Sequence, residues 1–307
     1  MIFQQSMITK KLWFVMLQTL LIMLLSACRA DRADLGQPAS DLDVQMRETQ
    51  ETESNPDDTL SVHFINVGEG DAILVVQGSH TMLIDGGSSE MGEVVVAYLR
   101  NHGIERLDYM VATHPFADHV GGVSDVLLSI ATENILLPMA YHDTLAYNTF
   151  LFAVEGSDAN VTVPFGGDTF ALGNAAITIL SPNPTDEWEN RANYSIVMRI
   201  EFGQTSFLFM GDAMSEVEAN LLNSEAHLSS DVLKVARHGA SSATTSTFLD
   251  AVSPQVAVIS AGESNSFLSQ EVLRRLGGIG AHIFRTDLNG NIVITSDGTT
   301  LGVVIER

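Results

Sequence analysis

Apolar runs of strand and helix length predict a series of short elements from Leu60 to the end of the chain. In the first half, we expect strands at 60–66, 72–76, 81–85, 108–113 and 135–138, and helices at 91–101, 122–130 and 146–154. In the second half, we expect strands at 160–164, 168–172, 175–180, 194–201, 205–210, 231–236, 255–260, 281–285, 290–295 and 299–305, and helices at 214–223, 245–251 and 270–277. Strands interspersed with helices in both halves favour an α/β fold, in which two mixed sheets pack together and helices lie outside.

The N-terminal pattern is different. Lys10-Lys11 precede an apolar run at 12–25, and Leu25-Ser26-Ala27-Cys28 follows. This order is typical of a secretory signal peptide, and the run is shorter than the about 20 residues of a membrane-spanning helix. The stretch Leu25-Ser26-Ala27-Cys28 resembles a bacterial lipobox. This resemblance predicts a lipoprotein-type signal peptide at 1–28 and a lipid on Cys28. The protein would then be anchored at the extracytoplasmic face of the cell membrane. The alternative, a buried structural cysteine, is disfavoured because nothing around Cys28 has the pattern of a packed domain.

The next stretch, 29–59, is predicted to be a disordered acidic linker. It is rich in Asp, Glu, Gln, Ser and Pro and cannot bury enough apolar surface to fold. The domain at 60–307 contains ten Lys plus Arg against 29 Asp plus Glu. Because non-specific DNA affinity depends on Lys and Arg displacing counterions, this balance argues against strong binding of duplex nucleic acid. Cys28 is the only cysteine, so a disulfide framework is excluded.

The strand at 108–113 leads directly into His114-Pro115-Phe116-Ala117-Asp118-His119-Val120-Gly121-Gly122. Two imidazoles and a carboxylate within six residues can face one point, and zinc accepts that set of ligands. A single histidine at a strand end is more often a surface or capping residue. The combination with Asp118 and the Gly-Gly turn instead favours a metal site.

Two further candidate ligands follow apolar strands of the second half. Asp212 comes after 205–210, and His238 comes after 231–236. The alternative for Asp212 is an N-cap before Met214, and the alternative for His238 is an ordinary loop histidine. Taken with the 114–119 cluster, both residues fit one rim built from the ends of several strands.

Together these segments resemble the metallo-β-lactamase superfamily, specifically the hydrolase domain of ComEC-type competence proteins and their stand-alone relatives. The matching segments are 64–72, 83–87, 113–122, 193–197, 211–213, 231–235 and 285–290. The resemblance implies an αββα sandwich with a metal site at one edge, between the sheets. It also implies site roles: His114, Asp118 and His119 as ligands, Asp212 as the metal-bridging aspartate, His238 as a late ligand, and Asp85 as a support behind the metal loop.

The chain also departs from the family pattern. Phe116 stands where the motif has its middle histidine, Arg237 stands where relatives usually have another histidine, and Leu268-Ser269-Gln270 replaces a frequent Gly-His-Pro. We therefore expect one divalent cation, zinc or manganese, to bind well through Asp118, His119, Asp212 and His238. A second would bind weakly or not at all. Arg237 is either a phosphate-binding residue or a solvent-exposed replacement.

The activity implied by the resemblance is metal-assisted hydrolysis of a phosphodiester or nucleic-acid substrate. A bound cation would activate water, and Asp118 or Asp212 would orient that water and accept its proton. The alternative is a binding or scaffold domain that lost catalysis with its histidines. A β-lactamase proper is less favoured, because the ComEC-like segments are more specific than the general fold pattern. The sequence indicates neither an oligomeric state nor a protein partner.

Overall fold

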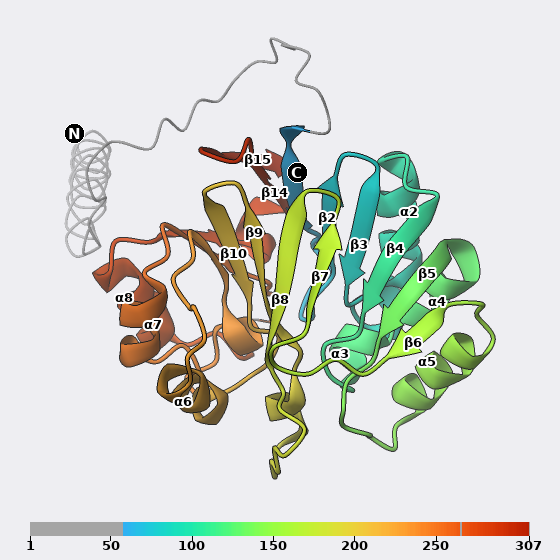
Figure 1. Ribbon diagram of the computed structural model, residues 1–307, viewed down its shortest axis with the longest axis horizontal. Coiled ribbons are helices and arrows are strands. Elements are labelled where there is room, and N and C mark those ends of the chain that lie inside the picture. Colours follow the sequence, from blue (N-terminus) through green and yellow to red (C-terminus); the bar gives the residue numbers. More distant parts are fainter. Residues whose placement is uncertain (1–57, 265, 307) are drawn as a thin grey trace, which may run out of the picture. The chain divides into compact units, whose positions relative to one another are not determined.

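The computed structural model describes residues 58–264 and 266–306 (Figure 1). The chain divides into two units, Met1–Asp43 and Val44–Arg307, and all described residues belong to the second. The predicted signal peptide at 1–28, with Cys28, and all but the end of the predicted linker at 29–59 lie outside the described residues. Within the described part of the chain, no helix is both long enough and apolar enough to cross a membrane.

Two mixed β-sheets form the centre of this unit. The eight-stranded sheet has the order β15-β14-β1-β2-β3-β4-β5-β6, and the seven-stranded sheet has the order β13-β12-β11-β10-β9-β8-β7. The strands of the first are β1 (Leu60–Phe64), β2 (Ile73–Gln77), β3 (His80–Ile84), β4 (Arg106–Val111), β5 (Ala131–Leu136), β6 (Asn160–Thr162), β14 (Asn291–Ser296) and β15 (Leu301–Glu306). Those of the second are β7 (Thr169–Leu172), β8 (Ala175–Ser181), β9 (Val197–Phe202), β10 (Thr205–Phe209), β11 (Val232–Lys234), β12 (Val256–Ile259) and β13 (His282–Arg285). Each sheet has a parallel half, β3 to β6 in the first and β10 to β13 in the second.

Helices cover the outer face of each sheet (Figure 1). The first sheet carries α2 (Gly92–Asn101), α4 (Val123–Ser129) and α5 (Leu145–Glu155), and the second carries α6 (Ser215–Asn223), α7 (Ser246–Val252) and α8 (Gln270–Gly278). Shorter turns are η2 (Ser89–Met91), α3 (Ala117–Val120), η3 (Arg191–Tyr194), η4 (Ala236–Gly239) and α9 (Thr286–Asn289). The prediction of two mixed sheets with helices outside is confirmed.

Strand alternation divides the buried apolar residues among three layers. In β3, Met82 and Ile84 face the core between the sheets, whereas Leu83 faces the core beneath α2, α4 and α5. Successive side chains of a strand point to opposite faces, so a strand buried on both faces is apolar throughout. Between the sheets, the rings of Phe64 and Phe209 stack at 6.4 Å, which joins the two halves of the chain in one core.

Several elements are shorter than the sequence predicts, and the difference has a cause at the site. β4 ends at Val111 rather than at 113, because the Thr113 N–H donates to the Asp85 carboxylate instead of to a strand. β11 ends at Lys234 rather than at 236, and the chain enters η4. The strand predicted at 194–201 begins only at Val197, after the turn η3.

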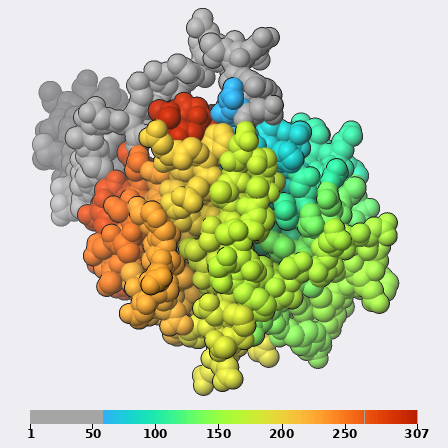
Figure 2. Space-filling model, viewed as in Figure 1, coloured from blue at the N-terminus to red at the C-terminus, as the bar shows by residue number. Residues whose placement is uncertain are grey.

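In the space-filling view, the yellow β8–β9 connection projects at the lower edge (Figure 2).

Candidate metal centre

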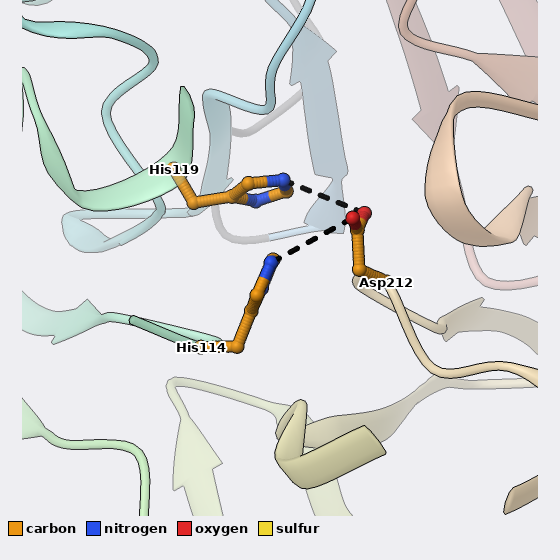
Figure 3. Close-up of side chains that lie close together, drawn as sticks. All are labelled: His114, His119 and Asp212. Carbon is orange, nitrogen blue, oxygen red and sulfur yellow. Dashed lines mark ion pairs between the residues drawn. The ribbon is translucent and has the colours of Figure 1, made fainter. Parts of the chain in front are cut away.

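Three strands from the two sheets deliver the predicted ligands to one place. His114 follows β4 of the first sheet, and α3 carries Asp118 and His119. In the second sheet, Asp212 follows β10 and His238 lies in η4, directly after β11. Figure 3 shows the rings of His114 and His119 directed toward the Asp212 carboxylate from different elements. The structure thus brings all five predicted ligands together, although their binding of a metal stays a prediction.

Three donor atoms form a tight triangle at the centre of this group. Asp212 Oδ1 lies 3.4 Å from His119 Nε2 and 3.4 Å from His238 Nε2, and the two nitrogens are 3.3 Å apart. Asp118 Oδ2 lies 3.8 Å from His119 Nε2 and 3.7 Å from His238 Nε2. His119, His238 and Asp212 are buried, whereas the Asp118 side chain is 31% exposed. Asp118 is therefore the donor that solvent reaches most easily.

The outer neighbours of the histidines fix which nitrogen carries the proton. His119 Nδ1 lies 2.8 Å from Asp85 Oδ2, and His238 Nδ1 lies 3.1 Å from the Ser260 carbonyl oxygen. Both partners are acceptors, so each Nδ1 carries a hydrogen and donates it. Each Nε2 then presents a lone pair to the other and to Asp212 Oδ1, which has no hydrogen-bond partner. Three acceptor atoms that face one another repel unless a proton or a metal cation lies between them.

The spacing of these donors fits a metal ion. Four-coordinate zinc with bonds of about 2.0–2.1 Å keeps its donors about 3.3–3.4 Å apart in an ideal tetrahedron. The His119, His238 and Asp212 atoms match that spacing at 3.3–3.4 Å, and Asp118 lies slightly farther out as the fourth donor. Imidazole and carboxylate ligands suit zinc and also manganese. The residues present therefore fit one divalent cation.

A second position, on the side of His114, has fewer donors. His114 Nε2 has no hydrogen-bond partner and lies 3.7 Å from Asp212 Oδ2. Its Nδ1 is 3.0 Å from Thr113 Oγ1, which itself donates to Asp85, so Nε2 again holds the lone pair. The Phe116 ring packs edge-on against the His114 ring, with their centroids 5.0 Å apart, and offers no lone pair. This side keeps His114 and Asp212, two fewer donors than the tetrahedral site needs.

The electrostatics of the cluster favour a positive charge at its centre. Burial alone would raise the pKa of Asp212, but the neighbouring His238, His119 and His114 outweigh burial and lower that pKa well below its usual range. Burial alone would lower the pKa of His119, but Asp212 and Asp85 raise it well above its usual value. The pKa of His114 is well below its usual value because of burial and of His119. A proton is thus held between His119 and Asp212, where a divalent cation can replace it.

Asp85 and close backbone contacts hold the metal loop in place. The Asp85 carboxylate is fully buried and accepts hydrogen bonds from the Thr113 N–H, the Thr113 hydroxyl and His119. This is the position behind the loop that the family resemblance implied. At Gly122, a Cβ would lie 2.1 Å from the Gly86 carbonyl oxygen, so only glycine lets the two loops approach this closely.

The alternatives considered for Asp212 and His238 do not describe the structure. The residue at the N-cap of α6 is Met214, and the Asp212 carboxylate faces the histidines instead. His238 is 2% exposed rather than a surface loop residue, and its backbone is in the left-handed region at φ 54°. In place of the family's Gly-His-Pro, Ser269 caps α8 by accepting a hydrogen bond from the Glu271 N–H.

Arg237 lies beside the centre and is half-buried. Its Nη1 donates to Met214 Sδ at 2.7 Å, and its guanidinium carbon is 6.0 Å from the centre of the Phe267 ring. Among residues 58–264 and 266–306, none of the ion pairs involves Arg237. The charge of Arg237 therefore has no carboxylate partner within the described part of the chain, and the half-buried guanidinium contacts a thioether and an aromatic ring instead.

The sequence reasoning missed two charged residues of this region, Asp71 and Lys234. Lys234 Nζ lies 2.7 Å from Asp71 Oδ2, and both side chains are buried directly behind His119 and His238. One signal in the sequence could have shown them. A lysine in the middle of the apolar run 232–236 has no solvated face on which to lie, so it needs a buried anion.

Comparison with known proteins gives the same family. Residues 65–263 match the family model described as the metallo-beta-lactamase superfamily. ComE operon protein 3 of Bacillus subtilis (strain 168) is 29% identical over 251 residues, which are 75% of this chain and 32% of that protein. Recombination protein 2 of Haemophilus influenzae (strain ATCC 51907 / DSM 11121 / KW20 / Rd) is 29% identical over 242 residues, which are 76% of this chain and 28% of that protein. The chain thus spans about a third of the length of these relatives, and the predicted resemblance to ComEC-type competence proteins is confirmed.

A solved structure supports the fold. The metallo-beta-lactamase fold protein YhfI from Bacillus subtilis superimposes with a TM-score of 0.51 at 14% identity, covering 78% of this chain and 100% of that one. At this identity the likeness concerns the fold alone. With the match to the family model over 65–263, it shows that this chain belongs to the metallo-β-lactamase superfamily.

Proposed function

We propose that this protein is a metal-dependent hydrolase of phosphoesters, of the phosphodiesterase type, that works with one firmly bound divalent cation. The observation that carries the proposal is the convergence of three potential metal-ligand atoms, His119 Nε2, His238 Nε2 and Asp212 Oδ1, at 3.3–3.4 Å. His119, His238, Asp212 and Asp118 would hold the cation. When bound, zinc or manganese supplies Lewis acidity and makes water a nucleophile near neutral pH.

The difference in exposure between Asp118 and Asp212 indicates which carboxylate accepts the proton of the attacking water. Asp118 is the donor open to solvent, with 31% of its side chain exposed, so it is the residue best placed to orient the attacking water and accept its proton. Asp212 is buried among three imidazoles, and its low pKa keeps it ionised as a ligand. We therefore assign the proton to Asp118 rather than to Asp212.

Arg237 is the candidate for holding the substrate. A guanidinium binds two oxygens of a phosphate in a forked geometry, which the thioether of Met214 cannot imitate. Replacing the weak Met214 contact by a phosphate would give Arg237 its missing anionic partner. This supports a phosphoester over a neutral substrate.

The relatives narrow the substrate further. Their names refer to competence and to recombination, two processes that handle DNA. We propose a phosphodiester of nucleic-acid type as the substrate. The excess of 29 Asp plus Glu over ten Lys plus Arg in 60–307 favours a short or single-stranded ligand over long duplex DNA.

The test uses the purified full chain. Its zinc and manganese content is measured by mass spectrometry, and hydrolysis is followed by release of p-nitrophenol from bis-p-nitrophenyl phosphate. We expect about one metal per chain and turnover that Asp118→Asn lowers at least about 100-fold. The matched control is Asp250→Asn, at an exposed site on α7, which should leave turnover unchanged. Equal turnover by Asp118→Asn and the wild type would contradict the proposal.

Two replacements, Phe116 and Ser269, favour a second candidate function. Phe116 occupies a ligand position, and Ser269 caps a helix where relatives often carry a histidine. These replacements favour a metal-binding module without catalysis. Stoichiometric metal without turnover of any phosphodiester tested would identify this second function.

We also propose that Cys28 anchors the protein to the membrane surface through a lipid. The lipobox-like Leu25-Ser26-Ala27-Cys28 supports this. Cells fed a radiolabelled fatty acid should label the wild type, and Cys28→Ala should abolish both the label and the recovery of the protein with membranes. Ser26→Thr, a small change in the same segment, serves as the control. Label on Cys28→Ala would contradict the anchor.

A further inference from the structure

Asp71 and Lys234 form a buried ion pair behind the metal ligands. Asp71 lies just before β2 and Lys234 is the last residue of β11, so the pair joins the two sheets. Lys234 Nζ is 2.7 Å from Asp71 Oδ2 and donates to the Val235 carbonyl oxygen at 3.0 Å. Asp71 and Lys234 are each 1% exposed. Water therefore screens their charges very little.

The stability of the fold does not by itself account for this pair. Burying two charges costs several kcal/mol per ion before their attraction is counted, and apolar replacements are often as stable. A pair kept only for stability would also have its remaining acceptors satisfied. Asp71 Oδ1 instead has no hydrogen-bond partner.

The unpaired oxygen and its neighbour both face ligand histidines. Asp71 Oδ1 lies 3.9 Å from His238 Nδ1, and Asp71 Oδ2 lies 3.9 Å from His119 Nδ1. These nitrogens already donate to closer acceptors, Ser260 and Asp85. At 3.9 Å, Asp71 acts on the imidazoles through its charge rather than through a hydrogen bond.

We infer that Asp71 and Lys234 are positioning residues that set the electrostatic potential of the metal centre, with Asp71 strengthening cation binding and Lys234 limiting it. The inference rests on the metal site of the proposed function. A negative charge behind two neutral imidazoles makes them better donors to a cation. Lys234 fixes the orientation of that carboxylate and offsets part of its charge. The centre already contains the carboxylates Asp85, Asp118 and Asp212. Without Lys234, the negative charge of Asp71 would add to theirs and the centre would hold a cation more tightly.

The two residues therefore have opposite effects on metal affinity. Asp71→Asn keeps the shape but leaves the Lys234 ammonium without its partner, and it should raise the Kd for Zn²⁺ by about 10-fold to 100-fold. Lys234→Met keeps the aliphatic chain but leaves Asp71 unopposed, and it should lower the Kd by about 10-fold. A purely structural pair would move both values in the same direction, because both variants damage the same contact.

The measurement is the Kd for Zn²⁺ of the full chain, by competition with a chromophoric chelator at about pH 8. Apparent Tm values in EDTA report the damage to the fold separately. Asp231→Asn is the matched control, because Asp231 precedes β11 at the end opposite Lys234 and binds Ser206 and Gln255. It should change the Tm but leave the Kd unchanged.

The outcomes separate this inference from the proposed function. A wild type that binds Zn²⁺ without hydrolysing phosphodiesters contradicts the proposed function and leaves the inference testable. If Asp71→Asn and Lys234→Met change the Kd for Zn²⁺ in the same direction, or if neither changes it, the inference is overturned. If either single variant fails to fold, the double variant Asp71→Asn/Lys234→Met decides, because it removes both charges at once. It should bind Zn²⁺ nearly as the wild type does, and a Kd raised at least 10-fold would overturn the inference.

Discussion

Among the described residues, histidines form close groups at two places, one around His63 and His102 and one at the metal centre, and only the second has the properties of a metal site. In the second cluster, the rings of His63 and His102 lie 5.2 Å apart, beside Tyr98 and Glu306. Tyr98 donates its hydroxyl hydrogen to Glu306, so His63 Nδ1 donates to Tyr98 Oη at 2.9 Å. His63 Nε2 lies 3.0 Å from the Ser61 hydroxyl, which can donate to it. Both nitrogens of His63 are therefore satisfied within the protein.

In the metal centre, each histidine keeps one nitrogen without such a partner. His119 and His238 use Nδ1 for an outer acceptor and turn Nε2 toward a carboxylate oxygen and toward each other. His114 Nε2 has no partner at all. Both clusters contain a buried histidine close to a second one, so proximity and a buried imidazole do not identify a metal site. The distinguishing property is a set of imidazole and carboxylate atoms that converge on one point.

The largest effect should come from removing the carboxylate between the lone pairs. Asp212→Ala takes away the acceptor that faces His114, His119 and His238. We expect at least about a 100-fold loss of metal affinity, more than an outer-shell change causes, and a matching loss of turnover. Metal analysis after dialysis measures this. The counterpart in the other cluster, Glu306→Ala, should leave the metal content unchanged, and a change there would remove the distinction between the clusters.

The next largest effect should be a gain of bound metal. Phe116→His restores a lone pair beside His114, on the side of the centre that holds only two donors. We expect the metal content to rise from about one toward two per chain at saturating zinc, since three ligands suffice for a catalytic zinc position. Isothermal titration with zinc counts the sites. Phe267→His, at a ring that packs on His238 instead, is the control and should add no site.

A pH effect should appear in the satisfied cluster. Burial, followed by the nearby His102, lowers the pKa of His63 to about 4 from 6.5. Between pH 6.5 and 4 the unfolded chain takes up a proton that folded His63 refuses, so stability falls as the pH falls through this window. The loss amounts to up to about 3 kcal/mol.

Denaturant unfolding of the metal-free full chain at several pH values measures this loss. His63→Gln should flatten the curve between pH 6.5 and 4, whereas His227→Gln, at an exposed histidine, should keep the wild-type slope. An unchanged slope in His63→Gln would show that other groups cause the pH dependence.

The smallest effect is expected at the rim of the same cluster. The His102 ring packs against the Tyr98 ring in a tilted arrangement, with 4.1 Å between ring centres. His102 also lies 3.8 Å from Glu306, and 29% of its side chain is exposed. His102→Asn should cost about 1 kcal/mol or less, since partly exposed pairs contribute little. Unfolding at pH 7.5 measures the cost. Metal content should stay at the wild-type value, and a loss of metal would tie this cluster to the centre.

Local patterns were sufficient for the fold and for the candidate ligands. Strands with continuous apolar residues, such as 205–210 and 231–236, predicted positions buried on both faces, and polar residues after their ends marked Asp212 and His238. Errors lie at element ends. β4 and β11 are shorter than predicted, because the residues after them bind to the site rather than to neighbouring strands.

The sequence by itself determined the elements, the two mixed sheets and the family, because apolar periodicity and ordered motifs are local properties of the chain. It could not decide which histidine nitrogen is free, because that depends on acceptors far away, such as Asp85 for His119 and Ser260 for His238. Nor could it pair Lys234 with Asp71, since Lys234 ends a strand of one sheet and Asp71 precedes a strand of the other. The tertiary structure decided these points, because the direction of a lone pair and the partner of a buried charge exist only once the strands are packed.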